Sequence, residues 1–220
     1  GDHPYDVHTN SAFGTNVYMK SSSDDGATWS GATQLNSFSS DIRNVSRDMQ
    51  ASYGTLFATW FNINYSDILG RRVSTVSPNA TNILREQLVG DATIIDATDE
   101  YNPSPNVVFT DANTGYMFFI GGNIYASGNY EVAYRKTTDG GAHWASQIEI
   151  ASFGMDGPAN VAVWYDQWTP GDAGTKIHIV AEEALTDDVW YNTLDTSNDS
   201  VDPDDWIPAI AGTAYAIGTD

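Results

Sequence analysis

Carboxylates in three predicted loops could supply the acid and the base of a glycosidic-bond hydrolysis. That reaction needs two carboxyl groups beside the bond, and their separation decides whether the anomeric configuration is retained or inverted. The loops span residues 40–47, 96–104 and 153–158. Their candidate ligand residues are Asp41, Arg43, Arg47, Asp99, Glu100, Tyr101 and Asp156. The alternative interpretation, which the acidic composition favours, is that these loop carboxylates are simply solvated.

A second group of oxygen donors lies near the end of the sequence. Residues 195–205 contain five carboxylates and one asparagine amide, and Ca²⁺ binds hard oxygen donors at such close spacing. The candidate metal ligands are Asp195, Asn198, Asp199, Asp202 and Asp204. The segment lacks the central glycine and the final glutamate of an EF-hand loop, so the alternative is an acidic turn capped by its own Asp and Asn side chains. Calcium is the one cofactor that the sequence offers, because the four histidines are scattered and there is no cysteine.

Two eight-residue segments, here called the first octet (residues 22–29) and the second octet (residues 137–144), share one pattern. The first contains Ser22, Asp24, Gly26, Thr28 and Trp29, and the second contains Thr137, Asp139, Gly141, His143 and Trp144. An Asp carboxylate can accept backbone N–H bonds across a tight turn, and glycine adopts the positive φ that such a turn needs. We therefore predict two hairpin turns in which each Asp accepts N–H bonds from its own turn and each Trp is mostly buried.

The octets resemble the Asp-box, or bacterial neuraminidase repeat, of sialidase-like β-propellers. In that family the box joins the third and fourth strands of a blade, away from the catalytic face, so the resemblance implies a fold and not a chemistry. It implies an all-β protein of four-stranded antiparallel blades, with four blade-like units at about residues 1–36, 48–90, 104–150 and 158–210. We interpret residues 1–220 as one β-propeller domain that is a segment of a propeller with six or more blades. The alternative is a four-bladed ring closed by a predicted strand at Gly212 to Gly218.

The resemblance also implies what a catalytic site would need. Sialidases use three arginines to clamp the substrate carboxylate, a Tyr–Glu nucleophile pair and an Asp acid/base, and paired guanidinium–carboxylate bonds explain the arginines. The Arg-Ile-Pro motif of the family is absent here. Arg71, Arg72 and Arg135 fall on predicted outer strands, and only Arg43 and Arg47 precede a predicted inner strand. We therefore predict that no three arginines converge on one carboxylate.

Composition narrows the environment and the partners. The chain has 29 acidic and nine basic residues, and its formal net charge is -20. Such a charge disfavours nucleic acid and anionic membrane surfaces as partners, and no apolar run approaches the roughly 20 residues of a membrane span. We predict an extracellular or cell-surface location. Four Asn-x-Ser/Thr sequons would become relevant there, at Asn44, Asn64, Asn79 and Asn198.

Two functions of different class follow from these observations. The first is a non-catalytic extracellular propeller that serves as a structural, cell-surface or glycan- and protein-interaction module, with other segments or subunits completing the propeller. Its aromatic candidates for stacking on a sugar are Trp164, Trp168, Tyr101 and Tyr125. The alternative is a sialidase-like glycoside hydrolase whose remaining active-site residues lie outside this segment.

Overall fold

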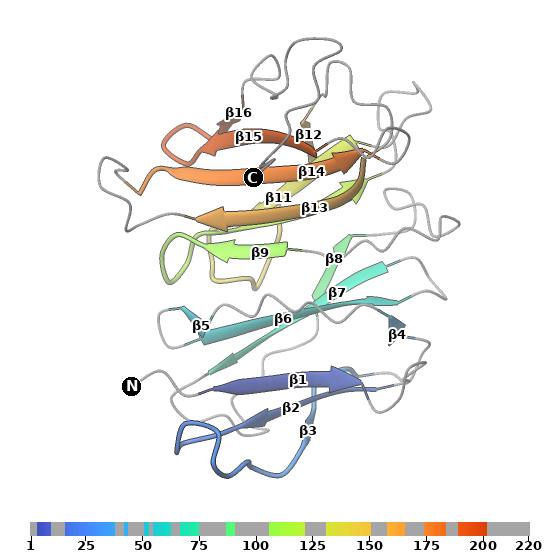
Figure 1. The fold of residues 1–220 in the computed structure, drawn as a ribbon, viewed down its shortest axis with the longest axis vertical. Coiled ribbons are helices and arrows are strands. Elements are labelled where there is room, and N and C mark those ends of the chain that lie inside the picture. The colour runs from blue at the N-terminus through green and yellow to red at the C-terminus, as the bar shows by residue number, and fades with distance from the viewer. Residues whose placement is uncertain are drawn as a thin grey trace, which may run out of the picture.

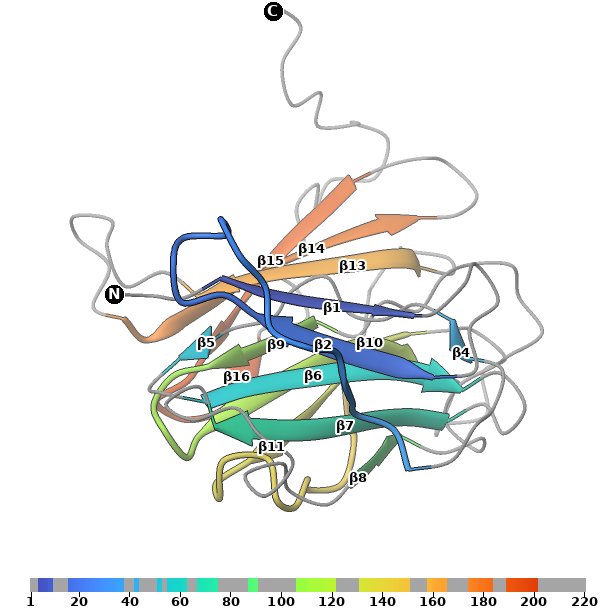
Figure 2. The same cartoon turned by 90° about the horizontal axis from the view of Figure 1, so that it is seen from below.

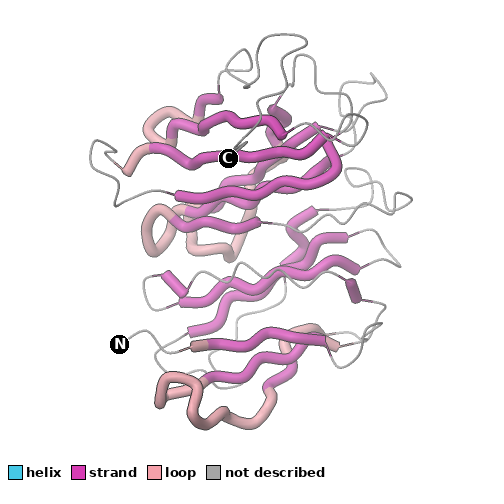
Figure 3. Tube along the Cα trace, in the orientation of Figure 1, coloured by secondary structure: helices cyan, strands magenta, loops and turns pink. Residues whose placement is uncertain are grey.

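The computed structural model describes residues 4–9, 16–37, 42–43, 51–52, 55–62, 67–74, 87–90, 106–121, 131–150, 158–165, 174–183 and 189–201. These residues form strands and turns, and no helix occurs among them (Figure 3). The described part of the chain accordingly offers no helix that could span a membrane.

The strands form four antiparallel sheets, each built from one continuous stretch of the chain. The first sheet has the order β1-β2-β3, from β1 (Tyr5–Thr9), β2 (Val17–Ser21) and β3 (Thr33–Gln34). The second has the order β4-β6-β7-β8, from β4 (Ile42–Arg43), β6 (Thr55–Asn62), β7 (Asp67–Ser74) and β8 (Gln87–Gly90), and β5 (Ala51–Ser52) also pairs with β6. The third has the order β12-β11-β10-β9, from β9 (Asn106–Phe109), β10 (Gly115–Gly121), β11 (Glu131–Thr137) and β12 (Ile148–Ile150). The fourth has the order β13-β14-β15-β16, from β13 (Pro158–Tyr165), β14 (Lys176–Glu183), β15 (Val189–Asp195) and β16 (Ser200–Val201).

The sheets stack face to face in chain order, with the first and fourth sheets at opposite ends (Figure 1). Seen from below, the strands of the first sheet lie over those of the second (Figure 2). No described strand of the fourth sheet pairs with the first sheet. The described strands therefore form an open stack with two end faces.

Three apolar layers hold the stack together. Between the first two sheets, Trp60 is fully buried among Val17, Met19 and Leu56. Phe57, which directly follows Leu56 in β6, points to the other face and packs on the third sheet, because successive strand residues face opposite sides. Burial of one such side chain stabilises the fold by roughly 1.5–3 kcal/mol.

The third sheet is covered on both faces. One face packs on Phe57, and the other contributes Val108, Tyr116, Phe118, Val132 and Tyr134 to the layer shared with the fourth sheet. For this reason β9 and the centre of β10 are buried at consecutive positions and read as continuous apolar runs.

One assignment of the sequence analysis was wrong. Residues Ile42 and Arg43 were predicted to lie in a loop, yet they form β4 and pair with Asn62 and Phe61. The last strand described in the fourth unit is β16, which pairs with β15 directly after the acidic turn. Residues 206–210 and the predicted strand at 212–218 lie outside the described residues.

Candidate functional site

The first octet folds around Asp24. The backbone N–H of Thr28 donates to Asp24 Oδ1 (2.8 Å), and the Thr28 hydroxyl donates to Asp24 Oδ2 (2.6 Å). Ser22 Oγ donates to Asp24 Oδ1 (2.7 Å) and accepts the N–H of Gly26 (2.8 Å). The Thr28 hydroxyl, followed by the Thr28 N–H and Ser22, lowers the pKa of Asp24 from 3.8 to about 2. These hydrogen bonds are those expected of a structural turn.

The second octet repeats this arrangement with different side chains. Thr137 Oγ1 donates to Asp139 Oδ1 (2.9 Å) and accepts the N–H of Gly141 (2.9 Å). His143 donates its backbone N–H to Asp139 Oδ1 (2.9 Å), and its Nδ1 lies 2.6 Å from Asp139 Oδ2. Burial raises the pKa of Asp139, but the bonds from His143 and Thr137 outweigh it and lower that pKa to about 2. Histidine thus substitutes for threonine in this turn.

The two octets differ in what covers them. The indole of Trp144 is half-buried and packs edge-on against Phe57 of the second sheet, with ring centroids 5.4 Å apart. Trp29 is 45% exposed, so the prediction that it is mostly buried was wrong. The physical reason is its location: the second octet lies between two sheets, whereas the first octet lies at the end of the stack, on the side away from β6 (Figure 1).

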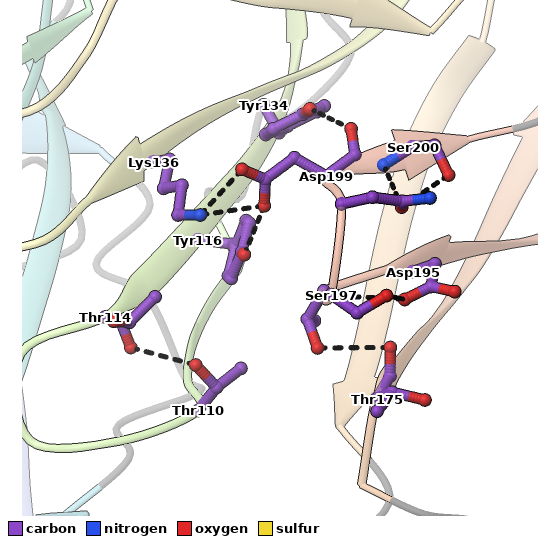
Figure 4. Close-up of polar contacts among 12 residues, drawn as sticks. Thr110, Thr114, Tyr116, Tyr134, Lys136, Thr175, Asp195, Ser197, Asp199 and Ser200 are labelled. Carbon is purple, nitrogen blue, oxygen red and sulfur yellow. Dashed lines mark hydrogen bonds and ion pairs between the residues drawn. The ribbon is translucent and has the colours of Figure 1, made fainter.

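The acidic turn between β15 and β16 contacts the third sheet through Asp199 (Figure 4). Lys136 Nζ lies 2.6 Å from Asp199 Oδ2 and 2.8 Å from Oδ1, and the Tyr116 hydroxyl donates to Oδ1 (2.5 Å). The Tyr134 hydroxyl donates to the Asp199 carbonyl (3.0 Å). Burial, and then the neighbouring Asp199 carboxylate, raises the pKa of Tyr134 to about 12 and also raises that of Tyr116. Both phenols therefore stay protonated and act as donors.

The predicted calcium ligands have protein partners where they are described. Asp195 Oδ1 accepts bonds from the N–H (2.9 Å) and hydroxyl (2.6 Å) of Ser197. Asn198 Oδ1 accepts equivalent bonds from Ser200 (3.1 and 2.6 Å). Asp202 and Asp204 lie outside the described residues, and within the described ranges no three acidic or histidine side chains gather around a common point. Calcium binding stays a prediction.

The predicted ligand face is described only at Arg43. The backbone of Arg43 belongs to β4 and pairs with Phe61. The other candidates lie outside the described residues: Asp41, Arg47, Asp99, Glu100, Tyr101 and Asp156. The structure therefore neither gathers nor separates these side chains.

Two neighbouring arginines of β7 point to opposite faces of the second sheet. Arg71 Nη2 donates to Ser37 Oγ (2.7 Å), which follows the first sheet. The Arg72 guanidinium lies over Gly140 of the second octet, so closely that a Cβ at that glycine would clash with it. Because successive strand residues face opposite sides, these two guanidiniums cannot bind the same carboxylate.

The open face of the fourth sheet carries three stacked rings, of which the sequence analysis found only Trp164. Trp164 is 53% exposed. Its indole stacks on His178 with centroids 5.7 Å apart, and His178 stacks on Tyr191 at 5.9 Å. On the same face, Asn160 Nδ2 donates to Glu182 Oε2 (2.7 Å). The sequence signal that could have identified His178 is the alternation of residues along β14, where His178 faces outward between two buried isoleucines.

Comparison with known proteins identifies the fold. No family model matches the sequence, and no curated protein does. Among solved structures, the NanB sialidase from Streptococcus pneumoniae matches with a TM-score of 0.55 and 14% identity, over 85% of this chain and 27% of that one. The fold is sialidase-like.

Two further structures support this sialidase-like fold. The intramolecular trans-sialidase from Ruminococcus gnavus matches with a TM-score of 0.51 and 15% identity, over 87% of this chain and 38% of its own. A protein of unknown function from Dyadobacter fermentans matches with a TM-score of 0.54 and 11% identity, over 88% and 52%. This chain therefore spans between about a quarter and about half of the structures that it resembles. At such identities the likeness shows the fold alone.

Proposed function

We propose that this chain is a non-catalytic part of a sialidase-like β-propeller, extracellular or on the cell surface, that recognises a glycan. In this proposal the octets are Asp-boxes with a structural role, and other segments or subunits complete the propeller. The opposite orientations of the Arg71 and Arg72 side chains give this proposal its strongest support. Arg71 donates to Ser37 and Arg72 contacts Gly140 of the second octet, so the two guanidiniums have separate partners on opposite faces of the sheet and do not converge on one sugar carboxylate.

Among the described residues, the stacked rings of the fourth sheet form the surface that is best suited to bind a sugar. Pyranose rings have apolar faces that pack on aromatic rings, and Trp164 presents a large exposed one. Asn160 and Glu182 lie across from one another on the same face and could exchange hydrogen bonds with sugar hydroxyls. With a net charge of -20, the protein repels polyanions, so we propose an uncharged glycan as the ligand.

Binding can be tested with a panel of neutral oligosaccharides titrated into the protein, followed by ligand-observed NMR. We expect Trp164→Ala to abolish binding. Trp29→Ala is the matched control, because Trp29 is similarly exposed (45% against 53%) but lies at the other end of the stack. Equal loss in both variants, or binding by neither protein nor variant, would contradict glycan recognition at this face.

The alternative function is a sialidase-like glycoside hydrolase, which the structural likeness to NanB and the trans-sialidase favours. A fluorogenic sialoside separates the two proposals. We expect no turnover above the buffer rate from the non-catalytic protein. Robust hydrolysis that Arg43→Ala removed would replace our proposal with the hydrolase.

A further inference from the structure

Two junctions between sheets share one construction, which we call the aromatic–cation rung. In the second sheet Phe57 of β6 is paired across the ladder with Arg72 of β7. In the third sheet Tyr116 of β10 is paired with Lys136 of β11, and Lys136 Nζ lies 5.3 Å from the Tyr116 ring centroid. Each rung therefore joins a ring and a cation on neighbouring strands, and each faces the next sheet of the stack.

Each rung supports the turn before the last strand of the following sheet. On the first rung rests the second octet, where a Cβ at Gly141 would lie 2.5 Å from Phe57 and Trp144 packs on the same ring. On the second rung rests the acidic turn, where Lys136 and Tyr116 both bind Asp199. In the second octet an indole packs on the ring of the rung, and in the acidic turn a carboxylate binds the cation of the rung.

The first octet combines both of these features. Its Trp29 corresponds to Trp144 of the second octet. Its Asp25, at the position of Gly140, has a φ of 56°, close to the 58° of Asp199. Asp25 and Asp199 are the two non-glycine residues with positive φ in the described part of the chain. The first octet thus offers an indole that can pack on an aromatic ring and a carboxylate that can bind a cation.

No rung lies against the first octet among the described residues. A Cβ at Gly26 would meet only Trp29 of its own turn, at 3.9 Å. The turn projects from the end of the stack, away from the second sheet (Figure 1). The internal hydrogen bonds of the turn are complete, so the exposed indole is not explained by a poorly formed turn.

We propose that the open face of the first sheet docks against a further β-sheet that carries an aromatic–cation rung, with the ring under Trp29 and Gly26 and the cation beside Asp25. The two described junctions supply the argument, since a ring lies under the indole at one of them and a cation lies beside the carboxylate at the other. The fourth sheet of a second copy fits less well. On its open face His178 pairs with Thr193, a ring without a cation, and two copies that each carry a net charge of -20 repel one another.

Hydroxyl-radical footprinting with mass spectrometry tests this without any substitution. The protein purified from its natural source is compared with the isolated 220-residue chain, and the modification rate of each tryptophan is measured. We expect Trp29 in the natural protein to be modified as slowly as Trp144, and faster in the isolated chain. An equal, fast rate at Trp29 in both samples would overturn the proposal.

A photo-crosslinker then identifies the occupant. The substitution Trp29→p-benzoylphenylalanine is introduced into the full-length protein, and crosslinked peptides are sequenced. A crosslink to a strand that neighbours an Arg- or Lys-bearing strand, outside residues 158–201, supports the proposal. A crosslink to β13, β14 or β15 would show that the fourth sheet of the same chain or of a second copy fills the face, and would overturn it.

Discussion

Replacement of the equivalent glycines in the two octets measures how firmly a turn rests on its neighbouring sheet. Gly26 and Gly141 both have a φ of 90°, so alanine costs about 1–2 kcal/mol of backbone strain at either position. Only at Gly141 would the new methyl group meet a neighbouring sheet, at 2.5 Å from Phe57, whereas Gly26 is open to within 3.9 Å. Overpacking of this kind costs roughly 1–3 kcal/mol more. We therefore expect Gly141→Ala to lower the free energy of unfolding by about 2–5 kcal/mol in total.

Urea unfolding followed by tryptophan fluorescence and circular dichroism gives both values under one condition. Gly31→Ala is a further control, because no atom lies within 4 Å of the Cβ position. In a Phe57→Leu background the smaller side chain leaves room for the methyl group, so the additional cost of Gly141→Ala should shrink. Equal costs at Gly26 and Gly141, unchanged by Phe57→Leu, would show that the second octet does not rest on Phe57.

Two more predictions concern the charged groups of the turns. In a double-mutant cycle, Lys136→Met and Asp199→Asn should show a coupling energy of about 1–2 kcal/mol, because the two side chains are hydrogen-bonded and only 25% and 34% exposed. The control cycle combines Lys176→Met with Asp199→Asn. Additive effects of Lys136→Met and Asp199→Asn would contradict the ion pair. In the folded protein the pKa values of Asp24 and Asp139 are lowered from 3.8 to about 2. The ionised carboxylates therefore stabilise the fold at any pH above their unfolded pKa, and this stabilisation is lost as the pH falls through their folded pKa. Asp24→Asn and Asp139→Asn should therefore weaken the fall in melting temperature between pH 4 and pH 2, and an unchanged slope would argue against these turns as its source.

The repeated turns and most strands could be predicted because they depend on local chemistry. An Asp, a glycine and hydroxyl groups within eight residues are sufficient to specify a turn, and alternation of apolar residues is sufficient to specify β14. The burial of Trp29 could not be predicted in this way, because it depends on a neighbouring sheet rather than on the octet. The same limit applies to Asp199, since the partner of its carboxylate, Lys136, is 63 positions away. The many carboxylates of this turn suggested that Asp199 is a metal ligand, because the sequence alone does not show that Lys136 lies beside it in the fold.

The fourth sheet shows why absence of the octet need not mean a weaker junction. At the junction of the second and third sheets, the turn contributes Trp144 and the supporting strand contributes a phenyl ring. At the next junction the turn has no tryptophan, yet Asp199 receives bonds from both members of the rung, Tyr116 and Lys136. Asp199 has a φ of 58°, and aspartate tolerates this left-handed conformation better than most residues do. At this junction, therefore, an acidic turn stands where another unit has an octet, and it binds a supporting rung that carries a cation and a phenol.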